Sequence, residues 1–290
     1  MSELLVATAT DPAATATDLD ALGLQEALAA LPADARPLDV ARRHLRAAEA
    51  TIRDRFEADG RAADVVFKRR LVIDELIRGL IDWAQWRRYP LPNPTPAERL
   101  AVLAVGGYGR GDLAPHSDID LLFLLPYKPT PRIEQLVETV LYTLWDLRLK
   151  VGHAVRSVDD ALRAARADTT VLTADLETRL LIGDTALYDD FKRRLADEVV
   201  AGRGVAYLEE KLKERAQRHE KVGDSRYLLE PNVKDGEGGL RDLHLILWLA
   251  RFFHQAQTLD DLASHGMLDR SELRTFRTAQ QFLWAVRCHL

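Results

Sequence analysis

Hydrophobic residues in the first third of the chain recur every three or four positions, the spacing of one face of an α-helix. Pro32 and Gly60 interrupt this pattern, and both residue types commonly end helices. The polar positions between the hydrophobic ones carry many arginines and glutamates, as expected for solvated helix faces. The pattern predicts three amphipathic helices, at residues 19–31, 37–59 and 62–88.

The pattern changes in the next part of the chain. Unbroken apolar runs at residues 101–105 and 121–125, and an alternating stretch at 150–158, predict three β-strands. Residues 133–149 return to helical spacing. Two strands followed by a helix and a further strand predict a small mixed β-sheet, and the fold class expected for the whole chain is therefore α+β.

From Val158 onward the hydrophobic spacing again predicts only helices. They are expected at residues 168–181, 186–200, 205–221, from 240 onward, and within 259–290. A proline-rich linker at 90–96 separates the first helices from the sheet. The predicted organisation is a mobile tail at 1–18, N-terminal helices at 19–89, a sheet domain at 97–165 and a helical domain at 166–290.

Composition narrows the classes of function. The 290 residues carry a formal charge of −5, which argues against a strong sequence-independent grip on nucleic acid. No apolar run approaches the roughly 20 residues that span a bilayer, so no membrane segment is expected. The single cysteine, Cys288, excludes an internal disulfide framework and favours a cytoplasmic protein. Because FLWAVRCHL ends within a helical pattern, we expect an N-terminal fragment of a longer protein.

The candidate chemistry lies where the two apolar runs meet a polar, glycine-rich loop. Asp118 and Asp120 are two positions apart, so on a strand they share one face. Adjacent carboxylates repel each other, and a divalent metal ion relieves that repulsion. Gly106 and Gly107 allow a backbone to approach a ligand closely and leave N–H groups free for phosphate oxygens. Together these residues predict a metal–nucleotide site.

The glycine spacing excludes two common nucleotide-binding loops. Gly107, Gly109 and Gly111 form GxGxG, and Asp112 occupies the place of the third glycine of the dinucleotide-binding motif. The chain contains no GxxxxGK[ST], so it has no P-loop. A glycine pair followed about a dozen residues later by Asp-x-Asp is more specific than either feature alone.

The stretch GGYGRGDLAPHSDIDLLFLLP (106–126) resembles the signature of the DNA polymerase β-like nucleotidyltransferases. Further stretches at 144–162, 176–184 and 230–251 resemble the bacterial PII uridylyltransferase/uridylyl-removing enzymes more narrowly. The resemblance runs from about residue 71 to the end. It implies a small nucleotidyltransferase domain that transfers UMP from UTP to a tyrosine hydroxyl of the PII signalling protein.

The resemblance also implies assignments for the site residues. Asp118 and Asp120 would hold two Mg²⁺ ions, one activating the tyrosine hydroxyl and one binding the triphosphate. Gly106 and Gly107 would hold the β- and γ-phosphates. UTP and PII are thus the expected partners. Neither the phosphohydrolase domain for UMP removal nor the paired glutamine-sensing domains of the full-length family enzymes fit within this chain.

Several residues carry two interpretations. Arg110 either binds a phosphate or forms an ion pair with Asp112. Ser117 either contacts a phosphate or caps a turn. These alternatives remain open at the level of sequence.

The same holds for the glycine-rich segment before the helix at 240. Lys234, Arg241 and Asp242 either face the nucleotide or belong to a tight interdomain turn with a structural Arg241–Asp242 ion pair.

Polymerase β-like sites usually have a third carboxylate on a later strand, and here it is not assigned. The third predicted strand carries His153, which we interpret as structural, and Asp146 precedes it at a helix end. Two other functions therefore stay open: a nucleotidyltransferase with another acceptor, and a non-catalytic nucleotide-binding regulatory module.

Overall fold

The structure is a computed structural model, and it describes residues 23–222, 232–256 and 258–290. The predicted tail at 1–18 and the first residues of the first predicted helix lie outside the described residues. So do Glu230 and Pro231, which belong to one of the stretches that resemble the uridylyltransferase family.

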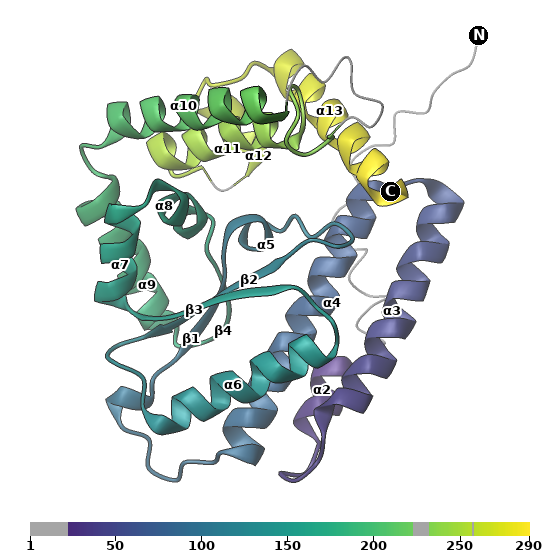
Figure 1. Cartoon of the computed structure of the whole chain (residues 1–290), viewed down its shortest axis with the longest axis vertical. Helices are drawn as coiled ribbons and strands as arrows, with labels where there is room; N and C mark the ends of the chain where they lie inside the picture. The colour runs from purple at the N-terminus through teal and green to yellow at the C-terminus, as the bar shows by residue number, and fades with distance from the viewer. Residues whose placement is uncertain (1–22, 223–231, 257) are drawn as a thin grey trace.

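A four-stranded mixed sheet lies at the centre of the described chain, in the order β3-β2-β1-β4 (Figure 1). Its strands are β1 (Ala101–Ala104), β2 (Ile119–Leu125), β3 (Val151–Ser157) and β4 (Arg179–Gly183). Strand β1 is antiparallel to β2 and to β4, whereas β2 and β3 are parallel. The parallel pair requires a crossover, and helix α6 (Pro131–Asp146) provides it. The predicted α+β class and small mixed sheet are confirmed.

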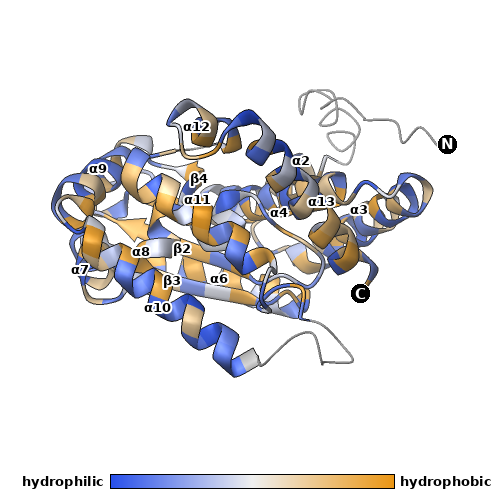
Figure 2. Ribbon diagram, turned by 90° about the horizontal axis from the view of Figure 1, so that it is seen from above, coloured by the Kyte–Doolittle hydropathy of each residue, from blue (hydrophilic) through white to orange (hydrophobic). Residues whose placement is uncertain are grey.

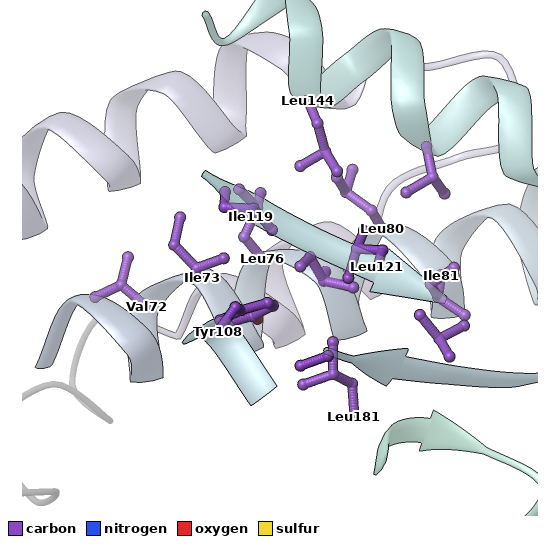
Figure 3. Packing of buried hydrophobic residues seen from close by; sticks show 14 of the residues in the cluster. Val72, Ile73, Leu76, Leu80, Ile81, Tyr108, Ile119, Leu121, Leu144 and Leu181 are labelled. Carbon is purple, nitrogen blue, oxygen red and sulfur yellow. The ribbon is translucent and has the colours of Figure 1, made fainter. Parts of the chain in front are cut away.

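Alternation along β2 divides the core between the two faces of the sheet. Ile119, Leu121 and Phe123 belong to a cluster with the N-terminal helices and α6. Leu122 and Leu124 belong to a second cluster on the opposite face. Figure 3 shows Ile119 and Leu121 lying among buried side chains of the N-terminal helices. Each such side chain contributes about 1.5–3 kcal/mol by leaving water, so both faces fix the position of β2 and of the acidic residues at its start.

The second and third N-terminal helices follow the predicted boundaries closely, whereas the first, predicted at 19–31, covers only Leu24–Ala29 of the described residues. They are α2 (Leu24–Ala29), α3 (Pro37–Asp59) and α4 (Ala62–Trp83), and α4 continues into a π-helical turn at Ala84–Arg88. Pro37 begins α3 at a position where its missing N–H leaves no bond unmade. Gly60 ends α3 with a φ of 67°, a left-handed conformation that glycine adopts without steric cost.

The predicted helix at 168–181 is wrong in its second half. Helix α8 covers only Thr169–Leu176, and Arg179–Gly183 forms the edge strand β4. A short apolar run such as RLLIG fits a strand or a helix equally well by periodicity. Its pairing with β1, which the local sequence does not contain, decides the matter. The sheet therefore extends beyond residue 165.

The predicted loop after β1 is also more ordered than expected. Residues Gly106–Arg110 form a short helix, α5, which packs against α8 and β2. A short 3₁₀ turn, Pro96–Glu98, follows the proline-rich linker and precedes β1.

The remaining helices cover the second face of the sheet and the side of the molecule above it (Figure 1). They are α7 (Val158–Ala167), α9 (Thr185–Leu195) with a π-helical turn at Ala196–Val200, α10 (Gly204–Val222), α11 (Leu240–His254), α12 (Leu259–Ser264) and α13 (Arg270–His289). Figure 2 shows hydrophobic strands in the middle of the molecule and a mostly hydrophilic α10 at its surface. Within the described ranges, none of the helices combines the length and the apolar character needed to cross a bilayer.

A buried polar cluster joins the N-terminal helices to the sheet. Asp74 of α4 is 2% exposed, which would be costly for a carboxylate without partners. It accepts hydrogen bonds from the Tyr108 hydroxyl at 2.6 Å and from Arg179 Nη1 at 2.7 Å. Since Tyr108 lies in α5 and Arg179 in β4, one carboxylate fixes both segments against α4.

Replacing this carboxylate should destabilise the fold. In Asp74→Asn the Arg179 guanidinium keeps its charge but loses its buried counter-charge, so we expect the free energy of unfolding to fall by about 3 kcal/mol. Urea denaturation followed by circular dichroism measures it. Asp39→Asn is the matched control, because this exposed residue makes only a 3.8 Å pair with Arg42 and should cost less than about 1 kcal/mol. Equal losses in the two variants would contradict the importance of the cluster.

A second buried carboxyl group, Asp175 of α8, lacks such partners. Its Oδ2 atom is buried and makes no hydrogen bond. Burial raises the pKa of Asp175 from 3.8 to about 7, although Arg156 and Lys192 oppose the shift. The native state therefore holds this proton more tightly than the unfolded chain does.

This proton gives the stability a defined pH dependence. Since the folded pKa lies above the unfolded one, the contribution of Asp175 is lost as the pH rises from about 4 to about 7. We expect Asp175→Asn to flatten the pH profile of the free energy of unfolding in this window, while Asp54→Asn, an exposed change on α3, leaves it as in the wild type. Chemical denaturation at several pH values measures both. A wild-type slope retained in Asp175→Asn would contradict the assignment.

Candidate active site between the sheet and the C-terminal helices

A cavity of about 440 Å³ opens between the start of β2 and helices α10, α11 and α13. The residues singled out in the sequence come from both sides of it. Eight of them line its wall: Gly106, Gly107, Arg110, Ser117, Asp118, Asp120, Lys234 and Arg241. The fold thus brings together two stretches that lie far apart in the chain.

The acidic pair lies at the mouth of β2. Asp118 is exposed just before the strand, and Asp120, on the strand, is partly buried. Burial and the nearby charge of Asp118 raise the pKa of Asp120, while Lys234 opposes the shift. Neighbouring carboxylates provide the hard oxygen donors that suit Mg²⁺. The pair therefore fits a divalent cation.

A third carboxylate ligand does not emerge beside this pair. Among the described residues, no three His, Cys, Asp or Glu side chains are grouped so as to hold a metal ion. The β3 residue paired with Asp120 is Gly152. His153 pairs with Leu121 and so faces the other side of the sheet, where its ring lies 5.8 Å from that of Trp145. Asp146 ends α6, exposed and outside the cavity wall.

The glycines of α5 serve different purposes. A Cβ atom on Gly109 would lie 1.9 Å from the carbonyl oxygen of Glu177, so close packing requires this glycine. A Cβ on Gly107 would meet only ordinary contacts, the nearest at 3.7 Å. Gly106 has a φ of 56° and lies beside Asp120, whose Oδ2 would be 3.8 Å from an added Cβ. Gly106 and Gly107 thus leave backbone open to the cavity next to the acidic pair.

Arg110 is enclosed by a buried network. Its side chain, only 8% exposed, donates to Asp112 Oδ2 at 2.5 Å and to Glu177 Oε2 at 2.6 Å. Its Nη2 atom also lies 3.2 Å from His244 Nε2. The Arg110–Asp112 ion pair, one of the two interpretations of Arg110, is present, whereas the sequence pattern did not indicate Glu177 or His244. The guanidinium is committed to these partners, which favours the structural interpretation over phosphate binding.

The network sets the charges of its members. Although burial works against it, Arg110 and His244 hold the pKa of the Asp112 carboxyl well below its usual range. Burial and the Arg110 charge lower the pKa of His244, which keeps the imidazole neutral near pH 7. Arg251 of α11 also pairs with Glu177, so two arginines neutralise two buried carboxylates.

Ser117 contacts the C-terminal helix rather than capping a turn with its side chain. Its hydroxyl accepts a hydrogen bond from Arg287 of α13 at 3.0 Å, and its N–H donates to the Ala114 carbonyl at 3.1 Å. This contact ties α13 to the loop that precedes the acidic pair.

The segment before α11 supplies cations to the cavity. Lys234 lies near enough to Asp120 to affect its pKa. Arg241 pairs with Asp235 at 3.2 Å, and its guanidinium carbon lies 5.9 Å from the centre of the Trp248 ring.

The predicted structural pair of Arg241 with Asp242 is wrong. Asp242 accepts instead from Arg218 Nη2 at 2.5 Å and from the Gly238 N–H at 2.9 Å, and it lies outside the cavity wall. Neighbouring residues on a helix point in different directions, so each finds its own partner.

The sequence pattern missed a further cation in the wall. Lys211 of α10 is buried, donates to Glu214 at 2.6 Å and lies 5.1 Å from the centre of the Trp248 ring. No local motif marks it, because α10 and α11 approach each other only in the folded chain.

Comparison with known proteins agrees with this geometry. Residues 95–166 match the family model described as a nucleotidyltransferase domain, and residues 206–290 match the model described as GlnD PII-uridylyltransferase. A bifunctional uridylyltransferase/uridylyl-removing enzyme of Azospirillum brasilense is 53% identical over 241 residues, 83% of this chain and 26% of the relative. One from Rhodospirillum rubrum is 51% identical over 257 residues, 88% of this chain and 28% of the relative.

The chain is homologous to the bifunctional uridylyltransferase/uridylyl-removing enzymes. It spans about a quarter of the length of these relatives. The matched nucleotidyltransferase domain contains α5, the acidic pair Asp118 and Asp120, and β3, and the second match contains Lys234, Arg241 and Trp248. The cavity of this uridylyltransferase homologue thus lies between the two matched regions.

Removing the charge of Arg110 tests whether this residue stabilises the fold or binds a phosphate. Arg110→Gln leaves Asp112 and Glu177 with less buried positive charge, so we expect the free energy of unfolding to drop by about 3–5 kcal/mol. Adding Glu177→Gln should cost less than the sum of the single changes, which a double-mutant cycle by urea denaturation measures. Arg163→Gln, an exposed control, should cost less than about 1 kcal/mol. Unchanged stability with weaker nucleotide binding would instead support the phosphate interpretation.

Proposed function

We propose that this chain is a metal-dependent nucleotidyltransferase unit that transfers UMP from UTP to a tyrosine hydroxyl of the PII signalling protein, as part of nitrogen regulation. One observation carries the proposal. The acidic pair, the open backbone of Gly106 and Gly107, and the cations Lys234 and Arg241 line a single cavity. The homology of the chain to bifunctional uridylyltransferase/uridylyl-removing enzymes supports uridylyl transfer in particular.

In the proposed reaction the tyrosine oxygen forms a bond to the α-phosphorus of UTP. The bond from that phosphorus to the bridging oxygen breaks, pyrophosphate leaves, and the phenolic proton passes to solvent. Asp118 and Asp120 would hold Mg²⁺, which when bound supplies positive charge for the attacking and leaving oxygens.

The residues of the chain would bind and orient the nucleotide. Gly106 and Gly107 would bring backbone N–H groups to the β- and γ-phosphates. Lys234 and Arg241 would face the triphosphate across the cavity and balance its charge. Ser117 lies beside the acidic pair, with its hydroxyl oriented by Arg287.

The direct test is incubation with PII, UTP and Mg²⁺ followed by intact-mass measurement of PII. We expect a mass gain of one UMP on a tyrosine, and a rate at least about 100-fold lower in Asp118→Asn and in Asp120→Asn. Asp146→Asn is the matched control, an exposed carboxylate outside the cavity, and should keep wild-type activity.

Other outcomes would point to the other functions. Undiminished transfer by Asp120→Asn would contradict the metal assignment. Mg²⁺-dependent binding of UTP without transfer to any acceptor would favour a non-catalytic regulatory module. Transfer to a different acceptor, with PII unmodified, would keep the chemistry and reject the partner.

A further inference from the structure

Strand β3 leaves one edge of the sheet open beside the cavity. It is the terminal strand of the order β3-β2-β1-β4, and among the described residues its backbone pairs only with β2 (Figure 1). Edge strands are normally protected by prolines, bulges, charged side chains or a covering segment. Its seven residues, VGHAVRS, contain no proline, pair with β2 without a bulge and carry a single charged side chain, Arg156. Such an edge is a template for a further strand.

The open edge lies directly next to the acidic pair. Gly152 is the register partner of Asp120, and a Cβ atom added to it would be 2.4 Å from Asp120 Oδ1. Because residue 152 has no side chain, the Asp120 carboxylate extends over β3 toward the open edge. A strand added to β3 would run two strand spacings, roughly 9.6 Å, from the Asp120 backbone. Because Asp120 Oδ1 already lies over Gly152, a tyrosine on the same face of the added strand would need to bridge only about one strand spacing, roughly 4.8 Å.

The other face of the same edge carries an exposed aromatic cluster. Tyr142 and Trp145 of α6 are 60% and 41% exposed, and their rings meet edge to face at 5.6 Å. Trp145 also meets His153 of β3 edge to face at 5.8 Å. Exposed aromatics gathered in this way are typical of protein-binding surfaces.

The charge of the edge indicates what binds there. Arg148, Lys150 and Arg156 lie within or just before β3. The acidic residues that follow the strand, Asp159 and Asp160, pair with Arg194 and Arg163. An extended segment with acidic residues complements this surface. Successive residues of a strand face opposite sides, so a tyrosine pointing to Asp120 would place its neighbours on the aromatic cluster.

We propose that the acceptor protein docks by adding an extended, acidic, tyrosine-bearing segment as a fifth strand on the outer edge of β3. The tyrosine passes over Gly152 to the acidic pair, and the two adjacent side chains pack on Tyr142, Trp145 and His153. The inference rests on the proposed function and names how the acceptor of that same site is held.

The first test separates docking from chemistry. Trp145→Ala should raise the KM for PII about tenfold while leaving kcat and the KM for UTP within twofold of wild type. Trp86→Ala is the matched control, since Trp86 is also exposed, at 61%, but belongs to the π-helical turn after α4 and not to the cluster of Tyr142, Trp145 and His153, and it should leave all three constants unchanged. Circular dichroism verifies that both variants fold.

The second test determines whether the bound segment forms backbone hydrogen bonds with β3, as an added strand would. Synthetic peptides that span the PII tyrosine, each N-methylated at one backbone nitrogen, are used as inhibitors of transfer to PII. Only alternate N–H groups of an added strand bond to the edge, so methylation should weaken inhibition about tenfold at every second position and leave the others within twofold.

The outcomes distinguish the two proposals. A flat N-methyl series, an unmodified peptide that does not inhibit, or a Trp145→Ala variant that behaves like Trp86→Ala overturns strand docking while UMP transfer stands. Absence of UMP transfer by the wild-type chain overturns both.

Discussion

The buried positive charge of Arg110 is the constraint on which the cavity depends. A guanidinium enclosed by protein is tolerated only when carboxylates surround it, and Asp112 and Glu177 provide them. Glu177 precedes β4 and also pairs with Arg251 of α11. The charge of Arg110 therefore connects helix α5, the segment that precedes β4 and the C-terminal helix α11. Helices α5 and α11 both contribute to the cavity wall.

Tyr108, two residues earlier, provides the complementary anchor. Its hydroxyl donates to Asp74 of α4, so Tyr108 ties α5 to the N-terminal helices. Arg110 ties α5 to the C-terminal helices, because its partner Glu177 also pairs with Arg251 of α11. The close packing of Gly109 on the Glu177 carbonyl completes the arrangement. Two side chains and one glycine of the sequence GGYGR thus position the loop, while Gly106 and Gly107 remain available to a ligand.

Much of this could be predicted from sequence, and the failures have physical causes. Helix α3 could be predicted because Pro37 and Gly60 limit the backbone locally at its two ends. The acidic pair could be predicted because Asp118 and Asp120 are two positions apart and follow a glycine pair. Strand β4 was missed because its identity depends on pairing with β1. Glu177, His244 and Lys211 were missed because only the folded chain brings them to the cavity, and no local pattern records such distant contacts. The importance of Gly152 could not be predicted, because it depends on the pairing of this glycine with Asp120 in the folded sheet.

The cavity wall has a thermodynamic consequence. Its two sides come from separate parts of the chain, with α5 and Asp120 on one and Lys234 and Arg241 on the other. A ligand that touches both sides gains affinity from their association, and by reciprocity its binding stabilises that association by the same coupling free energy. Substitutions in the Arg110 network would therefore change ligand affinity without touching the ligand, and a bound ligand would in turn protect the network from local unfolding.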